Sequence, residues 1–68
     1  MGISLSACER IAKNAGIKRI SKDALEELRD ILEEYGFEIA EKASKISSHS
    51  ERKTVKKKDI EFVIEKPR

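Results

Sequence analysis

The chain has 68 residues, of which 41% are charged and 38% hydrophobic. This length and composition predict one small, polar domain. A domain of this size buries only about 60% of the surface that its unfolded chain exposes, so a partner chain is expected. No apolar run approaches the roughly 20 residues of a membrane span, and the amino terminus lacks the basic start and apolar stretch of a leader peptide. We therefore expect an unprocessed, cytoplasmic protein without membrane contact.

The net charge of +2 hides a strong segregation of sign along the chain. Residues 1–22 carry a net +4, residues 23–41 carry −7, and residues 42–68 carry +5. Positive potential is therefore concentrated where the two ends of the chain lie, and a polyanion would bind there in spite of the near-neutral total.

The first helix is predicted over residues 5–15, with Ser4 or Ser6 as its N-cap. Gly16 is a typical helix terminator. Residues 17–20 then predict a loop with one extended step, and Ser21 stands where the N-cap of the next helix belongs. The apolar positions at helical spacing are Leu5, Cys8, Ile11, Ala12 and Ala15.

A long second helix is predicted over residues 22–48, which contain no proline and a single glycine, Gly36. A second polar loop follows, with a β-branched pair at Thr54 and Val55. A short third helix is predicted over residues 57–66, and Pro67 stops it. Its apolar face comprises Ile60, Val63 and Ile64.

The length of the second helix requires a partner. At 1.5 Å per residue it is about 40 Å long, whereas a compact globule of this size is roughly 28 Å across. The middle of this helix would therefore stay exposed to water in a single chain. Two long helices crossing at their centres, with Gly36 permitting close approach, would cover it. The alternative is a monomer whose long helix breaks at Gly36. The predicted dimer core comprises Leu28, Ile31, Leu32, Tyr35 and Ile39.

A set of motifs spans essentially the whole chain without a gap. It comprises Arg10-Ile11 with Lys13, Ala15-Gly16, Arg19 with Ser21, Ile31-Leu32-Glu33-Glu34, Ile39-Ala40, His49, and the most specific run, Arg52-Lys53-Thr54-Val55-Lys56 followed by Asp59-Ile60-Glu61. Together these residues resemble the archaeal histones, which are minimal histone folds without tails. The resemblance implies one all-α histone-fold domain over residues 1–68. It also implies a handshake dimer, in which the first loop of each chain pairs with the partner's second loop through short β-bridges.

The resemblance further implies a chromosomal protein that binds double-stranded DNA without sequence specificity. Such a protein bends, wraps and compacts DNA into nucleosome-like chromatin in the nucleoid. Wrapped DNA is held through its phosphates and its deformability rather than through base identity. The residues expected to bind DNA are Arg10, Lys13, Arg19, Lys53, Thr54 and Lys56. Taken singly, these are also ordinary surface cations and a turn threonine, and Lys57 and Lys58 are either solvated charges or extra DNA-binding ones.

Architectural contacts are implied by the same resemblance. Arg52 and Asp59 would form an internal ion pair that ties the second loop to the third helix. A dimer–dimer contact that builds tetramers or larger assemblies on DNA would use Ile46, His49, Asp59 and Phe62. The sequence departs from the family pattern in two acid–acid pairs, which would face each other across stacked dimers: Asp30 with Glu61 and Glu34 with Glu65. Repulsion between like charges disfavours long closed superhelices. The serines at 44, 47, 48 and 50 are likewise expected to weaken dimer–dimer contacts.

Catalytic and metal chemistry have no support in the sequence. Cys8 is the only cysteine, so it predicts a buried structural thiol, and His49 has no cysteine or histidine partner nearby. There is no nucleophile with a base partner and no glycine-rich phosphate loop, so we expect no enzyme, no cofactor and no small-molecule substrate. The alternative to a homodimeric histone is a histone-fold member of a heterodimer, in which DNA contact is secondary.

Overall fold

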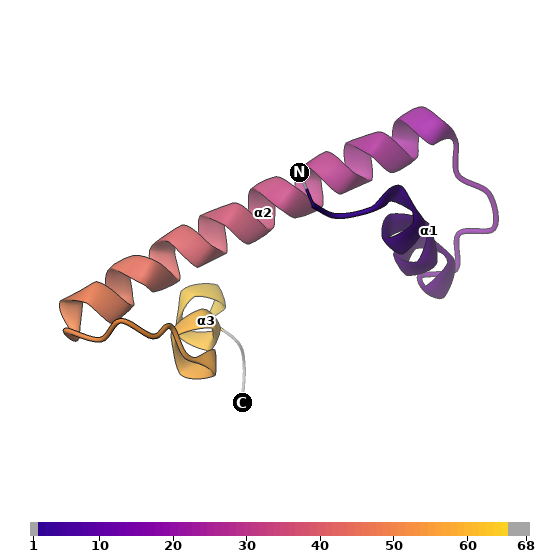
Figure 1. The fold of residues 1–68 in the computed structure, drawn as a ribbon. Coiled ribbons are helices and arrows are strands. Elements are labelled where there is room, and N and C mark those ends of the chain that lie inside the picture. Colours follow the sequence, from indigo (N-terminus) through magenta and orange to yellow (C-terminus); the bar gives the residue numbers. More distant parts are fainter. Residues whose placement is uncertain (1, 66–68) are drawn as a thin grey trace. The chain divides into compact units, whose positions relative to one another are not determined.

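Three helices make up the computed structural model, which describes residues 2–65 (Figure 1). They are α1 (Leu5–Asn14), α2 (Lys22–His49) and α3 (Lys57–Ile64). No strand occurs in this part of the chain, and the short, long, short order confirms the predicted all-α fold. The β-bridges expected between loops join two chains and stay a prediction.

The helix boundaries lie close to the predicted ones. α1 ends at Asn14 rather than at residue 15, because Ala15 forms the C-cap, and α2 continues one residue beyond the predicted end to His49. α3 ends at Ile64, where Glu65 takes a left-handed conformation. Residues 66 and 67, predicted as the last helical position and the stop, lie outside the described residues.

The chain divides into two compact units, one reaching to Glu34 and the other starting at Tyr35, and α2 contributes to both. In the first unit, Ser4 is the N-cap of α1: its Oγ accepts a hydrogen bond from the Ala7 amide at 3.0 Å. Cys8 is free and fully buried, as predicted, beside a buried Ala12. The Ile3 amide donates to a Glu33 carboxylate oxygen at 3.2 Å, which ties the amino-terminal segment to α2.

Both long loops begin with the same hydrogen-bonded helix end. After α1, Gly16 has φ +98°, and the Ile17 amide donates to the Ala12 carbonyl at 3.1 Å. After α2, Glu51 has φ +57°, and the Arg52 amide donates to the Ser47 carbonyl at 2.9 Å. A non-glycine residue in this left-handed region costs roughly 1–2 kcal/mol, so the end of α2 is strained where the end of α1 is not.

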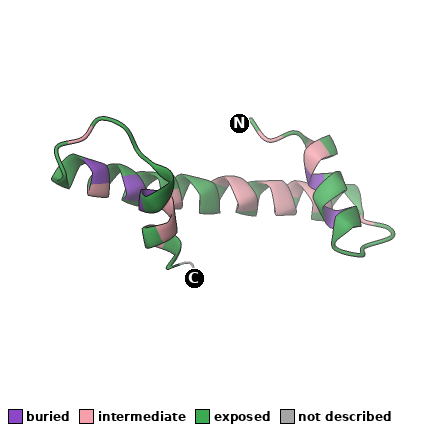
Figure 2. Cartoon of the chain, turned by 90° about the horizontal axis from the view of Figure 1, so that it is seen from below, coloured by how far each residue is buried: buried purple, intermediate pink, exposed green. Residues whose placement is uncertain are grey.

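The interior of a single chain is small. Only Cys8, Ala12, Ala43, Ser47 and Asp59 are buried among the described residues. They lie on α1, on the carboxyl-terminal part of α2 and on α3. Figure 2 shows the middle of the long helix as half-buried or exposed.

The predicted dimer core lies in this uncovered middle of α2. Ile31 is 54% exposed and Tyr35 58% exposed. Leu28, Leu32 and Ile39 are only half-buried. Their role as a dimer core stays a prediction.

Candidate nucleic-acid interface

The first unit presents three of the predicted DNA-binding residues. Arg10 and Lys13 are exposed on α1 and, three residues apart, share one side of the helix. The Lys13 ammonium lies 4.0 Å from a Glu9 carboxylate oxygen, but both groups are solvent-exposed, so this pair is weak and leaves Lys13 available to a phosphate. Arg19 is exposed in the loop between α1 and α2.

The second unit presents the other three, all in the loop between α2 and α3. Lys53, Thr54 and Lys56 are exposed, and Lys57 and Lys58 continue the run of cations into the first turn of α3. The structure therefore groups the predicted residues into two sets, one in each unit. Apart from the weak contact at Lys13, neither set has an ion-pair partner among the described residues that would neutralise its charge.

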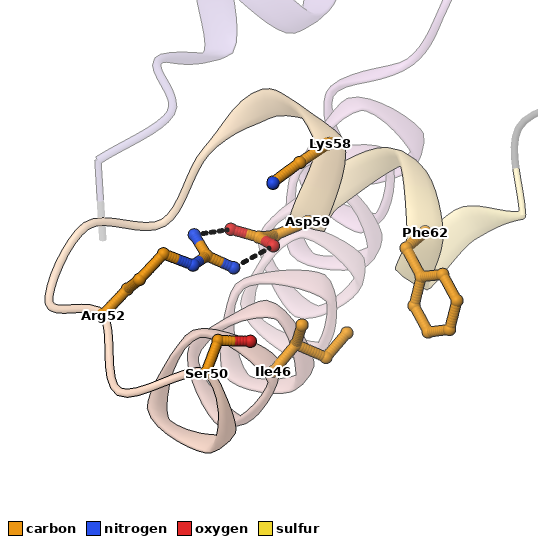
Figure 3. A pocket seen from close by; sticks show the side chains of 6 residues that line it. All are labelled: Ile46, Ser50, Arg52, Lys58, Asp59 and Phe62. Atoms are coloured by element: carbon orange, nitrogen blue, oxygen red, sulfur yellow. Dashed lines mark hydrogen bonds and ion pairs between the residues drawn. The ribbon is translucent and has the colours of Figure 1, made fainter.

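The backbone of this second loop is fixed by an ion pair between Arg52 and Asp59 (Figure 3). The Arg52 Nη2 lies 2.8 Å from Asp59 Oδ1, and Nη1 lies 2.9 Å from Oδ2, which is a two-pronged contact. Asp59 is 3% exposed and also accepts the Lys56 amide at 2.8 Å, so one carboxylate closes the loop and caps the start of α3. The predicted architectural pair is thus present in the geometry.

Electrostatics follow from these contacts. The hydrogen bond from Arg52, supported by the one from the Lys56 amide, lowers the pKa of Asp59 from 3.8 to about 2 in spite of the opposing effect of burial. The same hydrogen bond raises the pKa of Arg52. Both groups therefore stay charged across the physiological range.

Ser47 makes a loop contact that sequence reasoning missed. Its side chain is 3% exposed, and its Oγ donates toward the carbonyls of Arg52 at 2.8 Å and Thr54 at 3.2 Å. In the sequence, Ser47 belongs to the serine stretch that is expected to weaken assembly. The available signal was its position four residues after Ala43, where a polar side chain follows the buried face of α2.

An open hollow of about 360 Å³ lies beside the ion pair (Figure 3). It is lined by Ile46, Ser50, Arg52, Lys58, Asp59 and Phe62. Three of the four residues predicted for a dimer–dimer contact, Ile46, Asp59 and Phe62, meet here, and Phe62 is 71% exposed. His49 is exposed at the last position of α2 and does not line the hollow.

The described residues include no group of three or more histidine, cysteine or acidic side chains placed to hold a metal ion. Within the same residues, no helix combines the length and the apolar character that crossing a bilayer requires.

Comparisons with known proteins place these features in context. The model of the family described as histone-like transcription factor (CBF/NF-Y) and archaeal histone matches residues 1–64. The chain is 36% identical over 62 residues to one of the subunits of archaeal histone HAN1 from Thermococcus zilligii, covering 91% of this chain and 92% of that one. It is 39% identical over 62 residues to probable archaeal histone 3 of Methanocaldococcus jannaschii, with the same shares covered.

Replacing Asp59 with asparagine is expected to destabilise the fold in a pH-dependent way. Because the pKa of Asp59 lies at about 2 in the folded chain, below its ordinary 3.8, its charge stabilises the fold above about pH 4. That contribution is lost as the pH falls toward 2. The difference in urea unfolding midpoint between the parent protein and Asp59→Asn should therefore be large at pH 6 and shrink between pH 4 and pH 2.

The matched control is Asp30→Asn, which removes a carboxylate whose side chain is 63% exposed. Its unfolding midpoint should stay near that of the parent protein at each pH. A difference for Asp59→Asn that is unchanged between pH 6 and pH 2 would contradict the ion-pair assignment.

Proposed function

Because this chain belongs to the family of histone-like transcription factors (CBF/NF-Y) and archaeal histones, we propose that it dimerises and binds duplex DNA without sequence specificity. In doing so it bends, wraps and compacts the DNA into nucleosome-like chromatin. Its place in the cell is then the nucleoid. The family is one of structural chromosomal proteins, and we propose no enzymatic activity, cofactor or small-molecule substrate for this member.

The observation that carries the proposal is the fixed second loop. Its backbone is held by Ser47, Arg52 and Asp59, while the side chains of Lys53, Thr54 and Lys56 are exposed. A rigid edge with cations suits a phosphate backbone, since such contacts supply sequence-independent affinity. Arg10, Lys13 and Arg19 supply the corresponding cations of the first unit.

The proposed partner is a second copy of the chain. Ile31 and Tyr35 are more than half exposed within one chain, and leaving such side chains in water forfeits about 1.5–3 kcal/mol each relative to full burial. A second long helix crossing α2 near Gly36 covers this stretch in the proposed dimer.

A second candidate function is that of a histone-fold member of a heterodimer, with DNA contact secondary. The observation that favours it is the name of one relative, which describes that protein as one of the subunits of a histone. In this case, a different histone chain would cover the same exposed side chains of α2. Sedimentation of this chain alone separates the two candidates, because only the homodimer reaches twice the chain mass without a partner.

The dimer–dimer contact is proposed at the hollow that Ile46, Asp59 and Phe62 line, with His49 contributing from the end of α2. The acids Asp30, Glu34, Glu61 and Glu65 oppose further stacking of dimers along DNA, so we propose short assemblies rather than long closed superhelices. On wrapped DNA, nuclease digestion should then leave a short ladder of discrete fragments, whereas loose coating leaves a smear.

DNA affinity is expected to fall steeply with salt. A plot of the logarithm of the association constant against the logarithm of salt concentration should lose a slope of about 0.9 for each phosphate contact removed. Lys53→Ala and Arg19→Ala should each lower affinity, and their combination should lower it further. Fluorescence anisotropy with a labelled duplex of random sequence measures both quantities.

The matched control is Lys42→Ala, which removes an exposed lysine of α2 outside the predicted set. It should leave the slope nearly unchanged. Equal losses for Lys42→Ala and Lys53→Ala would mean that only net charge matters, and the loop would lose its assigned role.

Gly36→Ala tests the crossing of two long helices. Within one chain, a Cβ at Gly36 meets no atom within 4 Å apart from its chain neighbours and the backbone of its own helix, so alanine would by itself favour the helix by roughly 0.5–1 kcal/mol. In the proposed dimer, alanine is expected to be destabilising instead, because the added methyl group meets the partner helix. Sedimentation equilibrium should show weaker dimers for Gly36→Ala, while Ser44→Ala on the same helix leaves them unchanged. Stronger dimers would place the crossing elsewhere.

Phe62→Ala tests the dimer–dimer contact. Because Phe62 is 71% exposed within one chain, its removal should leave the helical content and the dimer intact but lower the fraction of tetramers. Multi-angle light scattering measures that fraction. Phe37→Ala removes the other phenylalanine, which is 60% exposed and does not line the hollow, so it should leave the tetramers as they are. An unchanged tetramer fraction in Phe62→Ala would exclude the hollow as the contact.

A further inference from the structure

Ser47 holds the start of the second loop with both its backbone and its side chain. Its carbonyl accepts the Arg52 amide at 2.9 Å, and its Oγ lies 2.8 Å from the Arg52 carbonyl oxygen. Both polar groups of the Arg52 backbone are therefore bound by one residue of the last turn of α2. Ser47 is 3% exposed, so its hydroxyl is shielded from water.

The Thr54 carbonyl is held from two sides. Ser47 Oγ lies 3.2 Å from it, and Arg52 Nη1 donates to it at 3.1 Å. That same Nη1 is 2.9 Å from Asp59 Oδ2, so the loop carbonyl is connected to the ion pair as well as to α2. Lys53 lies between the two residues whose carbonyls are bound, and its own side chain is exposed.

A buried serine within a helix is energetically unfavourable unless its hydroxyl is hydrogen-bonded, and the loop contacts provide that bonding. Serine is a weaker helix former than alanine, and a buried hydroxyl without acceptors is unfavourable. The neighbouring buried residue on the same face of α2 is Ala43. The Ser47 hydroxyl shares its single proton between the two carbonyl acceptors, so its burial is matched by hydrogen bonding that an alanine could not make.

We propose that Ser47 is a positioning residue for DNA binding, whose buried hydroxyl holds the Arg52 and Thr54 carbonyls so that Lys53 and Thr54 meet the phosphates from a prearranged loop. The inference rests on the proposed function and adds a residue that does not itself touch DNA. Its physical basis is preorganisation: a loop that is already ordered loses less conformational entropy on binding.

The first test compares Ser47→Ala with its neighbour Ser48→Ala, which removes an exposed hydroxyl from the same turn. Loss of one hydrogen bond corresponds to an affinity change of about three- to tenfold. Ser47→Ala should therefore bind a random-sequence duplex about three- to tenfold more weakly, with unchanged helical content and dimer mass. Ser48→Ala should bind like the parent protein. Equal affinity of Ser47→Ala and the parent protein would overturn the inference.

A second readout separates positioning from a merely structural role. If Ser47 acts through Lys53, then Lys53→Ala should cost less affinity in the Ser47→Ala background than in the parent protein. Amide hydrogen exchange at Arg52 and Lys56, the loop amides that are hydrogen-bonded in the parent protein, should also be faster in Ser47→Ala, with no change in α1. Additive losses together with unchanged exchange would overturn the inference.

Failure of a variant to fold, or of the parent protein to bind, still leaves a decisive measurement. Should Ser47→Ala fail to fold, Ser47→Cys keeps the shape of the side chain with a larger, weaker donor atom, and parental affinity of this folded variant would overturn the inference. If the parent protein itself does not bind the duplex, the proposed function fails. The exchange rates of the Arg52 and Lys56 amides then still decide whether the hydroxyl holds the loop.

Discussion

The apolar side chains that one chain leaves uncovered along α2 are the constraint on which the rest depends. A helix of 28 residues has two ends that short helices can cover and a middle that they do not. Ile31 and Tyr35 are each more than half exposed there, and burying such apolar side chains against a partner is favourable. In the proposed dimer, association through α2 satisfies that constraint and also decides where the basic loops of the two chains come to lie.

In the second loop, some charged groups make contacts within the fold and others are exposed to solvent. Asp59 forms an ion pair with Arg52 and accepts a hydrogen bond from the Lys56 amide, which caps the start of α3. Its negative charge is therefore used within the fold. The side chains of Lys53 and Lys56 form no ion pair within the described part of the chain and face solvent. Separating structural charge from available charge in this way allows a chain of net charge +2 to present a positive edge.

Most of the fold could be predicted from local signals, whereas parts of the site could not. Ser4 or Ser6 as a cap and Gly16 as a terminator carry their meaning in the residue type, so these residues predict the bounds of α1 to within one or two residues, and the structure selects Ser4. The end of α2 depends instead on Glu51 in a left-handed conformation, which no residue preference indicates. The role of Ser47 depends on carbonyls five and seven residues further along, and spacing alone does not reveal such contacts. The residues expected to bind DNA are predicted from a pattern that spans the whole sequence rather than from one local signal.

The scarcity of buried residues has a thermodynamic consequence. An interior made of a cysteine, two alanines, a serine and an aspartate supplies little of the free energy that ordering a chain requires. In the proposed dimer, most of the burial is created by association, so the folded state and the complex form in one step. The melting temperature of such a protein rises with its own concentration. Its abundance in the cell then sets how much of it is folded at all.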